Sequence, residues 1–115
     1  MKLHVSAACT LLLLALAAPA FGQTQYEMNL ESKKAFEKAD AALNDAYGKL
    51  LATLDDEGKK KLRDAERLWV KFRDAECDSK ADDYRGGSIM PLIYFTCAKR
   101  LTDERTAQLK DRLGH

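Results

Sequence analysis

Apolar residues recur every three or four positions from Phe36 to Leu54, which is the spacing that places them on one face of an α-helix. Lysine and glutamate fill many of the other positions. The apolar stripe consists of Phe36, Ala39, Leu43, Ala46, Tyr47, Leu50 and Leu54. Residues 23–30 form a polar lead that we expect to be loose at its start. This pattern predicts a first helix over about residues 30–54.

A second amphipathic run follows directly. The sequence Asp55-Asp56-Glu57-Gly58 ends one helix and starts the next, because aspartate caps helix N-termini and acidic residues suit the positive end of the helix dipole. We predict a second helix over about residues 57–82, whose buried face comprises Leu62, Ala65, Leu68, Trp69, Phe72 and Ala75. Because the connection is short, the first two helices are expected to be antiparallel neighbours.

A third helix is predicted over about residues 89–112. Ser88 is a candidate N-cap, and Pro91 suits the first turn of a helix. The run from Leu92 is apolar on nearly all sides, so these first turns are expected to be the most buried part of the domain. Before it lie Gly86 and Gly87, which let the backbone turn with positive φ. The pattern predicts a small, all-α, antiparallel three-helix domain.

Residues 1–22 have the features of a secretory signal peptide. Lys2 gives a positive start, residues 11–18 an apolar middle, and Ala18-Pro19-Ala20 or Ala20-Phe21-Gly22 a cleavage site with small residues. The apolar run is shorter than the roughly 20 residues of a membrane span. We expect cleavage and export to the periplasm or the medium, with residues 23–115 as one domain outside the membrane. An uncleaved membrane anchor is the alternative.

Removal of this segment takes away Cys9 and leaves two cysteines, Cys77 and Cys97. In an oxidising compartment an even pair is most simply a disulfide, which would cross the turn between the second and third helices. The competing interpretation is a zinc site, but zinc needs about four ligands and the one histidine left is His115. We therefore predict a disulfide and no bound metal.

Charge and composition exclude several classes of function. The chain has 19 basic and 18 acidic residues, and Lys2 is the one charged residue of the signal segment, so the mature chain is neutral. A nucleic-acid-binding protein would show a basic excess. Without an internal histidine base, a free thiol or a glycine-rich phosphate loop, the mature chain is not expected to be an enzyme or to bind a cofactor.

Charge is unevenly distributed along the second predicted helix. Residues 59–67 hold five basic and two acidic side chains, whereas residues 74–83 hold five acidic and one basic. Negative charge at a helix C-terminus opposes the helix dipole by about 0.3 to 1 kcal/mol per residue at low salt. One interpretation is a solvated face on a stable helix. The other is an acidic patch for a cationic partner, formed by Asp74, Asp78, Asp82 and Asp83.

Three spaced motifs stand out. They are Trp69-x-x-Phe72-Arg73-Asp74-x-x-Cys77, Gly86-Gly87-Ser88-Ile89-x-Pro91 and Cys97-x-x-x-Leu101-Thr102-x-x-Arg105. Together they resemble the LprI-like lysozyme-inhibitor family of exported bacterial helical domains, whose first-helix pattern matches Asp40-x-x-Leu43-x-x-x-Tyr47-x-x-Leu50-Leu51. The likeness covers about residues 36–112, although residues 23–35 lack the additional cysteine pair of many members. It implies an exported, disulfide-bonded helical domain and inhibition of lysozyme.

The motif residues have structural roles to weigh against binding roles. Trp69 shares the apolar stripe of the second helix and is expected to anchor the core. Arg73 and Arg105 are expected to fix the glycine turn by binding carboxylates or free carbonyl groups, with partner contact as the alternative. Other residues have no evident core role and are candidates for partner binding, namely Asp78, Asp82, Asp83, Tyr84, Arg85 and Ser88.

Two functional hypotheses follow. In the first, the module binds a lysozyme-type glycan hydrolase, and a rigid loop presents an arginine and hydroxyl groups to the two carboxyl groups of the cleft. In the second, a structural or stress-related envelope protein binds another partner, or itself, through its charged faces. An exposed, polar and stiff loop would favour the first hypothesis, because a merely structural hairpin needs none.

Overall fold

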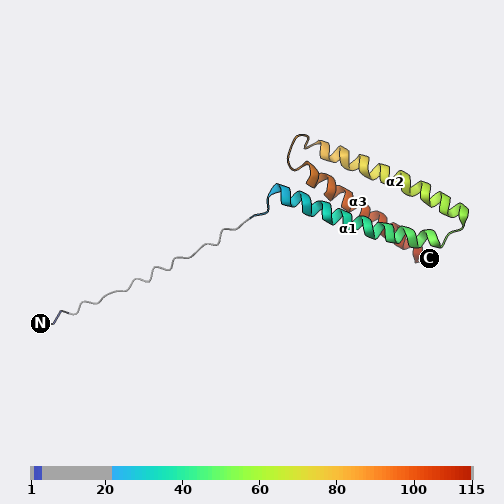
Figure 1. The fold of residues 1–115 in the computed structure, drawn as a ribbon, viewed down its shortest axis with the longest axis horizontal. Coiled ribbons are helices and arrows are strands. Elements are labelled where there is room, and N and C mark those ends of the chain that lie inside the picture. Colours follow the sequence, from blue (N-terminus) through green and yellow to red (C-terminus); the bar gives the residue numbers. More distant parts are fainter. Residues whose placement is uncertain (1, 4–21, 115) are drawn as a thin grey trace.

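The computed structural model describes residues 2–3 and 22–114, so most of the predicted signal peptide lies outside the described residues. Three helices form the domain (Figure 1): α1 (Gln25–Ala52), α2 (Asp56–Asp82) and α3 (Met90–Leu113). The described residues contain no strand. The predicted all-α, three-helix class is confirmed, and so is the disulfide between Cys77 and Cys97.

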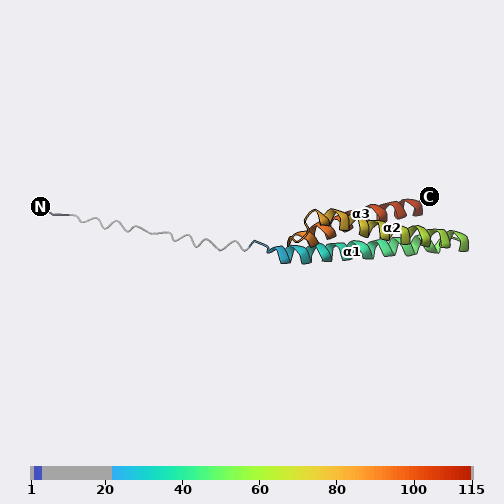
Figure 2. The same cartoon turned by 90° about the horizontal axis from the view of Figure 1, so that it is seen from above.

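Helices α1 and α2 both pack against α3. The contact between α1 and α3 is the most extensive, that between α2 and α3 is smaller, and α1 and α2 have little direct contact. The three helices lie alongside one another, and the chain reverses direction at both connections (Figures 1 and 2). A short connection therefore joins α1 to α2 without making them the closest neighbours in the domain.

The first helix starts earlier than its apolar stripe predicted. Thr24 caps it: the hydroxyl of Thr24 accepts from the Glu27 backbone N–H at 3.1 Å, and the Glu27 carboxylate accepts from the Thr24 N–H at 3.4 Å. This reciprocal pair is a capping box, which satisfies two N–H groups at the helix start. The first helix therefore begins about five residues before the predicted start near residue 30, because capping rather than apolar packing begins α1.

The second helix starts as predicted, with the Asp55 carboxylate accepting from the Gly58 N–H at 2.8 Å. Its predicted buried face is largely wrong. Leu68 and Phe72 are 63% and 54% exposed, and Ala65 and Ala75 are also exposed. The side chains that α2 buries are Leu62, Glu66, Arg73, Cys77 and Ala81. Apolar periodicity failed here because the buried face contains two charged residues that find partners on other helices.

The apolar core has two centres. The one nearer the connection of α1 and α2 comprises Leu43, Ala46, Leu50, Leu62 and Leu109, with Trp69 packed against them. The one nearer the glycine turn comprises Cys77, Cys97 and Ala98, with Phe36, Tyr94 and Leu101 packed around them. The disulfide is therefore part of the core as well as a covalent link.

The first turns of α3 are less buried than expected. Pro91 lies in the first turn as predicted but is exposed, and residues 92–95 are half-buried. The residues of α3 that are fully buried lie further along, namely Ala98, Thr102 and Leu109. The expectation that the start of α3 is the most buried part of the domain is wrong, because a surface groove between α2 and α3 opens there.

Candidate functional site

The connection between α2 and α3, residues 83–89, turns tightly. The Gly87 N–H donates to the Tyr84 carbonyl at 2.9 Å, and the Arg85 N–H donates to the Asp82 carbonyl at 3.0 Å. Gly86 has a φ of 80°, in the left-handed region that residues with side chains disfavour. A Cβ on Gly87 would lie 3.1 Å from the Tyr84 carbonyl oxygen. A side chain at Gly86 would strain the backbone, and one at Gly87 would force the Tyr84 carbonyl group to shift.

Two contacts restrain this part of the domain, a disulfide between the two helices that flank the connection and a hydrogen bond from α1 to the connection itself. The disulfide joins Cys77 of α2 to Cys97 of α3, with Cα atoms 5.5 Å apart. From α1, the Asn29 side chain donates from Nδ2 to the Ser88 carbonyl oxygen at 2.9 Å. Ser88 is not the N-cap that we predicted, because the capping position is Ile89 and no side chain caps α3. Ser88 instead offers its carbonyl group to α1.

The candidate binding side chains of the connection lie at the surface. Tyr84 is 45% exposed, and Arg85 and Ser88 are exposed. The Arg85 guanidinium forms a fork with the Asp82 carboxylate, with Nε–Oδ1 and Nη2–Oδ2 distances of 2.8 and 2.6 Å. The hydrogen bond to Asp82 raises the pKa of Arg85 above its usual value. Because Arg85 neutralises Asp82, the remaining acidic groups of the patch carry most of its charge.

Asp78 is exposed on the last turns of α2, and Asp83 is exposed directly after the helix ends. The structure therefore brings the six candidate binding residues to the end of the domain where α2 stops and the chain turns into α3. Asp74 differs from them, since its Oδ1 accepts from Nε of Arg73 at 2.9 Å. Asp74 belongs to the interior network described next.

Arg73 is buried and contacts all three helices. Its side chain is 8% exposed, and Nη1 donates to Asp40 Oδ1 of α1 at 3.2 Å. The same nitrogen donates to Thr102 Oγ1 of α3 at 3.4 Å, while Nε binds Asp74 of α2. A charge in the interior is tolerated where carboxylates and hydroxyls satisfy its donors. Arg73 thus links the helices in the middle of the bundle.

Aromatic rings cover the same guanidinium. Its carbon lies 4.9 Å from the centroid of the Phe36 ring and 5.4 Å from that of Trp69, distances typical of cation–π contacts. Trp69 is half-buried and packs against the core centre that contains Leu43 and Leu62. Trp69 thus contacts the core with part of its ring, and the same ring supports Arg73.

Arg105 of α3 forms an ion pair with Glu66 of α2. Nε and Nη2 both donate to Glu66 Oε2, at 3.0 and 2.9 Å, and the two side chains are 16% and 12% exposed. The second oxygen, Oε1, is buried without a hydrogen-bond partner among the described residues. The prediction that Arg73 and Arg105 fix the glycine turn is wrong. Both guanidinium groups bind side chains on helices and hold the helices together.

The family model "Lysozyme inhibitor LprI" matches residues 17–109, a range that includes both ion pairs, the disulfide and the connection. The chain belongs to the LprI lysozyme-inhibitor family. An uncharacterised protein of Rhizobium meliloti (strain 1021) is 30% identical to it, over 87% of this chain and 88% of the relative. No solved structure matches the chain significantly.

Two residues that shape this LprI-family domain were not among the candidates from the sequence. Asn29 lies in the polar stretch ahead of the predicted first helix, and Glu66 lies among the charged residues of α2. Apolar periodicity gives no sign of either contact, because polar residues on a helix are normally solvated. The one available signal for Glu66 was the motif residue Arg105, since a buried arginine needs a carboxylate.

The described residues include no group of three histidine, cysteine, aspartate or glutamate side chains placed to hold a metal ion. Within the same part of this LprI-family chain, no helix combines the length and the apolar character needed to cross a membrane.

Proposed function

We propose that this protein is exported and inhibits a lysozyme-type glycan hydrolase by binding it, without catalysing a reaction itself. Membership of the LprI family supports the proposal. The observation that carries it is a connection that is exposed and polar and yet restrained. A disulfide links the two helices that flank the connection, and Asn29 of α1 binds the Ser88 carbonyl group. A loop ordered before binding loses little conformational entropy on association, so even a short one can bind well.

In this proposal Arg85, Tyr84 and Ser88 contact the partner. Lysozyme-type hydrolases cut their substrate between two carboxyl groups in a cleft. A guanidinium group binds a carboxylate through two parallel hydrogen bonds, as Arg85 does with Asp82 in the free protein. The side chains of that pair are 78% and 50% exposed, so water screens it and exchange of Asp82 for a cleft carboxylate costs little.

The acidic end of α2 contributes to the association step, before the two proteins are in contact. The mature chain is neutral, so its net charge does not attract a partner. A local acidic surface still draws in a cationic protein and raises the association rate. Because Asp82 is neutralised by Arg85, Asp78 and Asp83 supply most of this attraction.

One observation favours a second candidate function. Leu68 and Phe72 are exposed on α2, and with Ala65 and Ala75 they form an apolar stripe at spacings of three and four residues. A continuous apolar face on an exposed helix is typical of a contact with another protein. The alternative is a structural or stress-related envelope protein that binds another partner, or a second copy of itself, through α2.

The test is a pull-down with several lysozyme types, paired with measurement of residual lysozyme activity. The proposal predicts binding and lost activity with at least one type, and weaker effects after reduction of the disulfide. A variant with Leu68→Ser and Phe72→Ser is the matched control, because it alters α2 and leaves the connection intact. Lysozyme binding that the control loses and an Arg85→Ala variant keeps would move the contact from the connection to α2. Absence of binding to every lysozyme type would favour the alternative function.

A further inference from the structure

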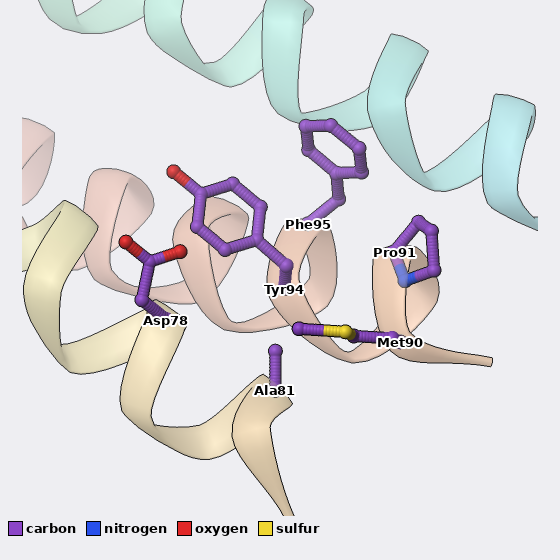
Figure 3. Close-up of a pocket in the computed structure, with 6 residues that line it drawn as sticks. All are labelled: Asp78, Ala81, Met90, Pro91, Tyr94 and Phe95. Carbon is purple, nitrogen blue, oxygen red and sulfur yellow. The ribbon is translucent and has the colours of Figure 1, made fainter. Parts of the chain in front are cut away.

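A groove of about 300 Å³ lies between the last turns of α2 and the first turns of α3. Its lining comprises Asp78, Ala81, Met90, Pro91, Tyr94 and Phe95. Figure 3 shows the Tyr94 ring between the Asp78 carboxylate and the Phe95 ring, with Met90 and Pro91 on the α3 side. The groove is thus apolar along most of its surface and carries one carboxylate at its edge.

The aromatic surface of the groove is fixed in position from behind. The Tyr94 and Phe95 rings meet edge-on, with centroids 5.2 Å apart, and Phe95 packs against Phe36 of α1 at 5.9 Å. The Tyr94 hydroxyl donates to Asp74 Oδ1 at 3.4 Å, which orients the ring along α2. A ligand that enters the groove therefore meets a preformed aromatic surface rather than one that must be ordered first.

Acidic groups lie beside the Tyr94 ring, and one of them, Asp78, lines the groove itself. Burial raises the pKa of Tyr94, the carboxylates of Asp74 and Asp78 raise it further, and Arg73 has the opposite effect. Arg73 already binds Asp74 directly. Among the described residues no hydrogen bond or ion pair engages the Asp78 carboxylate, so its charge remains available at the edge of the groove.

We propose that this groove binds an arginine side chain of a basic protein partner. The methylene stem packs on Met90 and Pro91, and the guanidinium group lies against the Tyr94 ring and binds the Asp78 carboxylate. Arginine suits such a site because its weakly hydrated, planar head stacks on aromatic rings and forms directed hydrogen bonds. This inference rests on the proposed function, since it names a second contact for the same cationic partner.

Other occupants fit the groove less well. A purely apolar side chain would cover the Asp78 carboxylate without giving it a hydrogen-bond partner, which costs free energy. An anionic group would be repelled by Asp78. The neutral analogue of arginine, citrulline, has nearly the same shape and lacks the charge, so it separates the electrostatic contribution from the packing.

The experiment is an NMR titration of the oxidised protein with a blocked glycine–arginine–glycine peptide, which follows the Met90 methyl and Tyr94 ring signals. The matched peptides carry citrulline or leucine in place of arginine. The matched variants are Asp78→Asn and Asp83→Asn, which remove the same charge from a residue that lines the groove and from one that does not. Fold integrity of both variants is checked by circular dichroism.

We expect the arginine peptide to shift both signals saturably and to bind more tightly than the citrulline peptide. Asp78→Asn should weaken its binding roughly two- to five-fold, the range of an exposed ion pair, whereas Asp83→Asn should leave it unchanged. Equal binding of arginine and citrulline peptides, tighter binding of the leucine peptide, or equal losses in the two variants would each overturn the proposal. Tighter leucine binding would identify an apolar occupant instead.

This titration uses no lysozyme, so its outcome is separate from that of the proposed function. If the groove binds the arginine peptide but the protein binds no lysozyme, the groove proposal is supported and lysozyme is excluded as the partner. Lysozyme inhibition without peptide binding would leave the connection as the contact surface and remove the groove from the account.

Discussion

Asn29, in the first turns of α1, donates a hydrogen bond from Nδ2 to the carbonyl oxygen of Ser88, which lies 59 positions later in the chain. The disulfide links α2 and α3, the helices that flank the same connection. Each of the three helices therefore restrains the element that we propose as the binding surface, and loss of one restraint should loosen it locally.

Asn29→Ala should release the connection while the fold persists. An exposed hydrogen bond of this kind contributes at most about 0.5 to 1.5 kcal/mol, so the melting temperature should fall only slightly. Hydrogen exchange at the backbone amides of residues 86–88 should become faster. The control is Asn44→Ala, an exposed asparagine on the same helix. Unchanged exchange at residues 86–88 would show that Asn29 does not restrain the connection.

The disulfide should supply a large share of the stability. It joins cysteines 20 positions apart, and closing a loop of that length stabilises a fold by about 3 kcal/mol in the chain-entropy model. The total for a small domain is about 5 to 15 kcal/mol. Thermal unfolding with and without reductant measures the effect. The double variant with Cys77→Ser and Cys97→Ser should have a lower melting temperature than the parent, and the reductant should not change it. Equal melting temperatures for the parent in both conditions would contradict this prediction.

Substitutions of Trp69 and Phe72 by alanine should differ sharply in their effect on stability, although the two residues belong to one motif. Trp69→Ala removes a ring that packs on the core and supports Arg73, so it should cost about 2 kcal/mol or more. Phe72 is 54% exposed, and Phe72→Ala should stay within about 1 kcal/mol of the parent. Urea unfolding of both variants gives the comparison. Similar losses would mean that the helix face toward the core is the one predicted from apolar periodicity.

That apolar periodicity shows where sequence reasoning succeeded and failed. The three helices and the disulfide could be predicted, because helix spacing, capping residues and an even cysteine pair are local signals. The buried face of α2 could not, since Glu66 and Arg73 are buried by partners 39 and 33 positions away. Periodicity assumes that burial follows apolarity, and paired charges break that assumption.

The candidate site was predictable to a similar extent. Asp82, Tyr84, Arg85 and Ser88 are close in sequence, so a glycine turn between two helices necessarily brings them to one end of the domain. The fork between Asp82 and Arg85 follows the three-residue spacing that places side chains together at a helix end. The bond from Asn29 joins distant segments, and only the packing of α1 against α3 could reveal it.

Glu66 and Arg105 should depend on each other, because each buried charge is tolerated only while its partner is present. Arg105→Leu leaves a buried carboxylate without a partner, and such losses cost about 3 kcal/mol or more. Glu66→Leu should be similarly harmful. The double variant, with Glu66→Leu and Arg105→Leu, should be more stable than either single variant, because no uncompensated charge remains. Urea unfolding of all four proteins measures the coupling, and additive losses would indicate that the two residues act independently.

The central claim is that the connection between α2 and α3 contacts the lysozyme-type partner. The most direct measurement is the dissociation rate from an immobilised lysozyme that the protein inhibits, compared between the parent and a variant with Arg85→Ala and Ser88→Ala. Circular dichroism confirms that the variant is folded. Loss of a charge-assisted hydrogen bond at the contact should speed dissociation about ten-fold or more, with a smaller change in the association rate. An unchanged dissociation rate in the folded variant would contradict the claim.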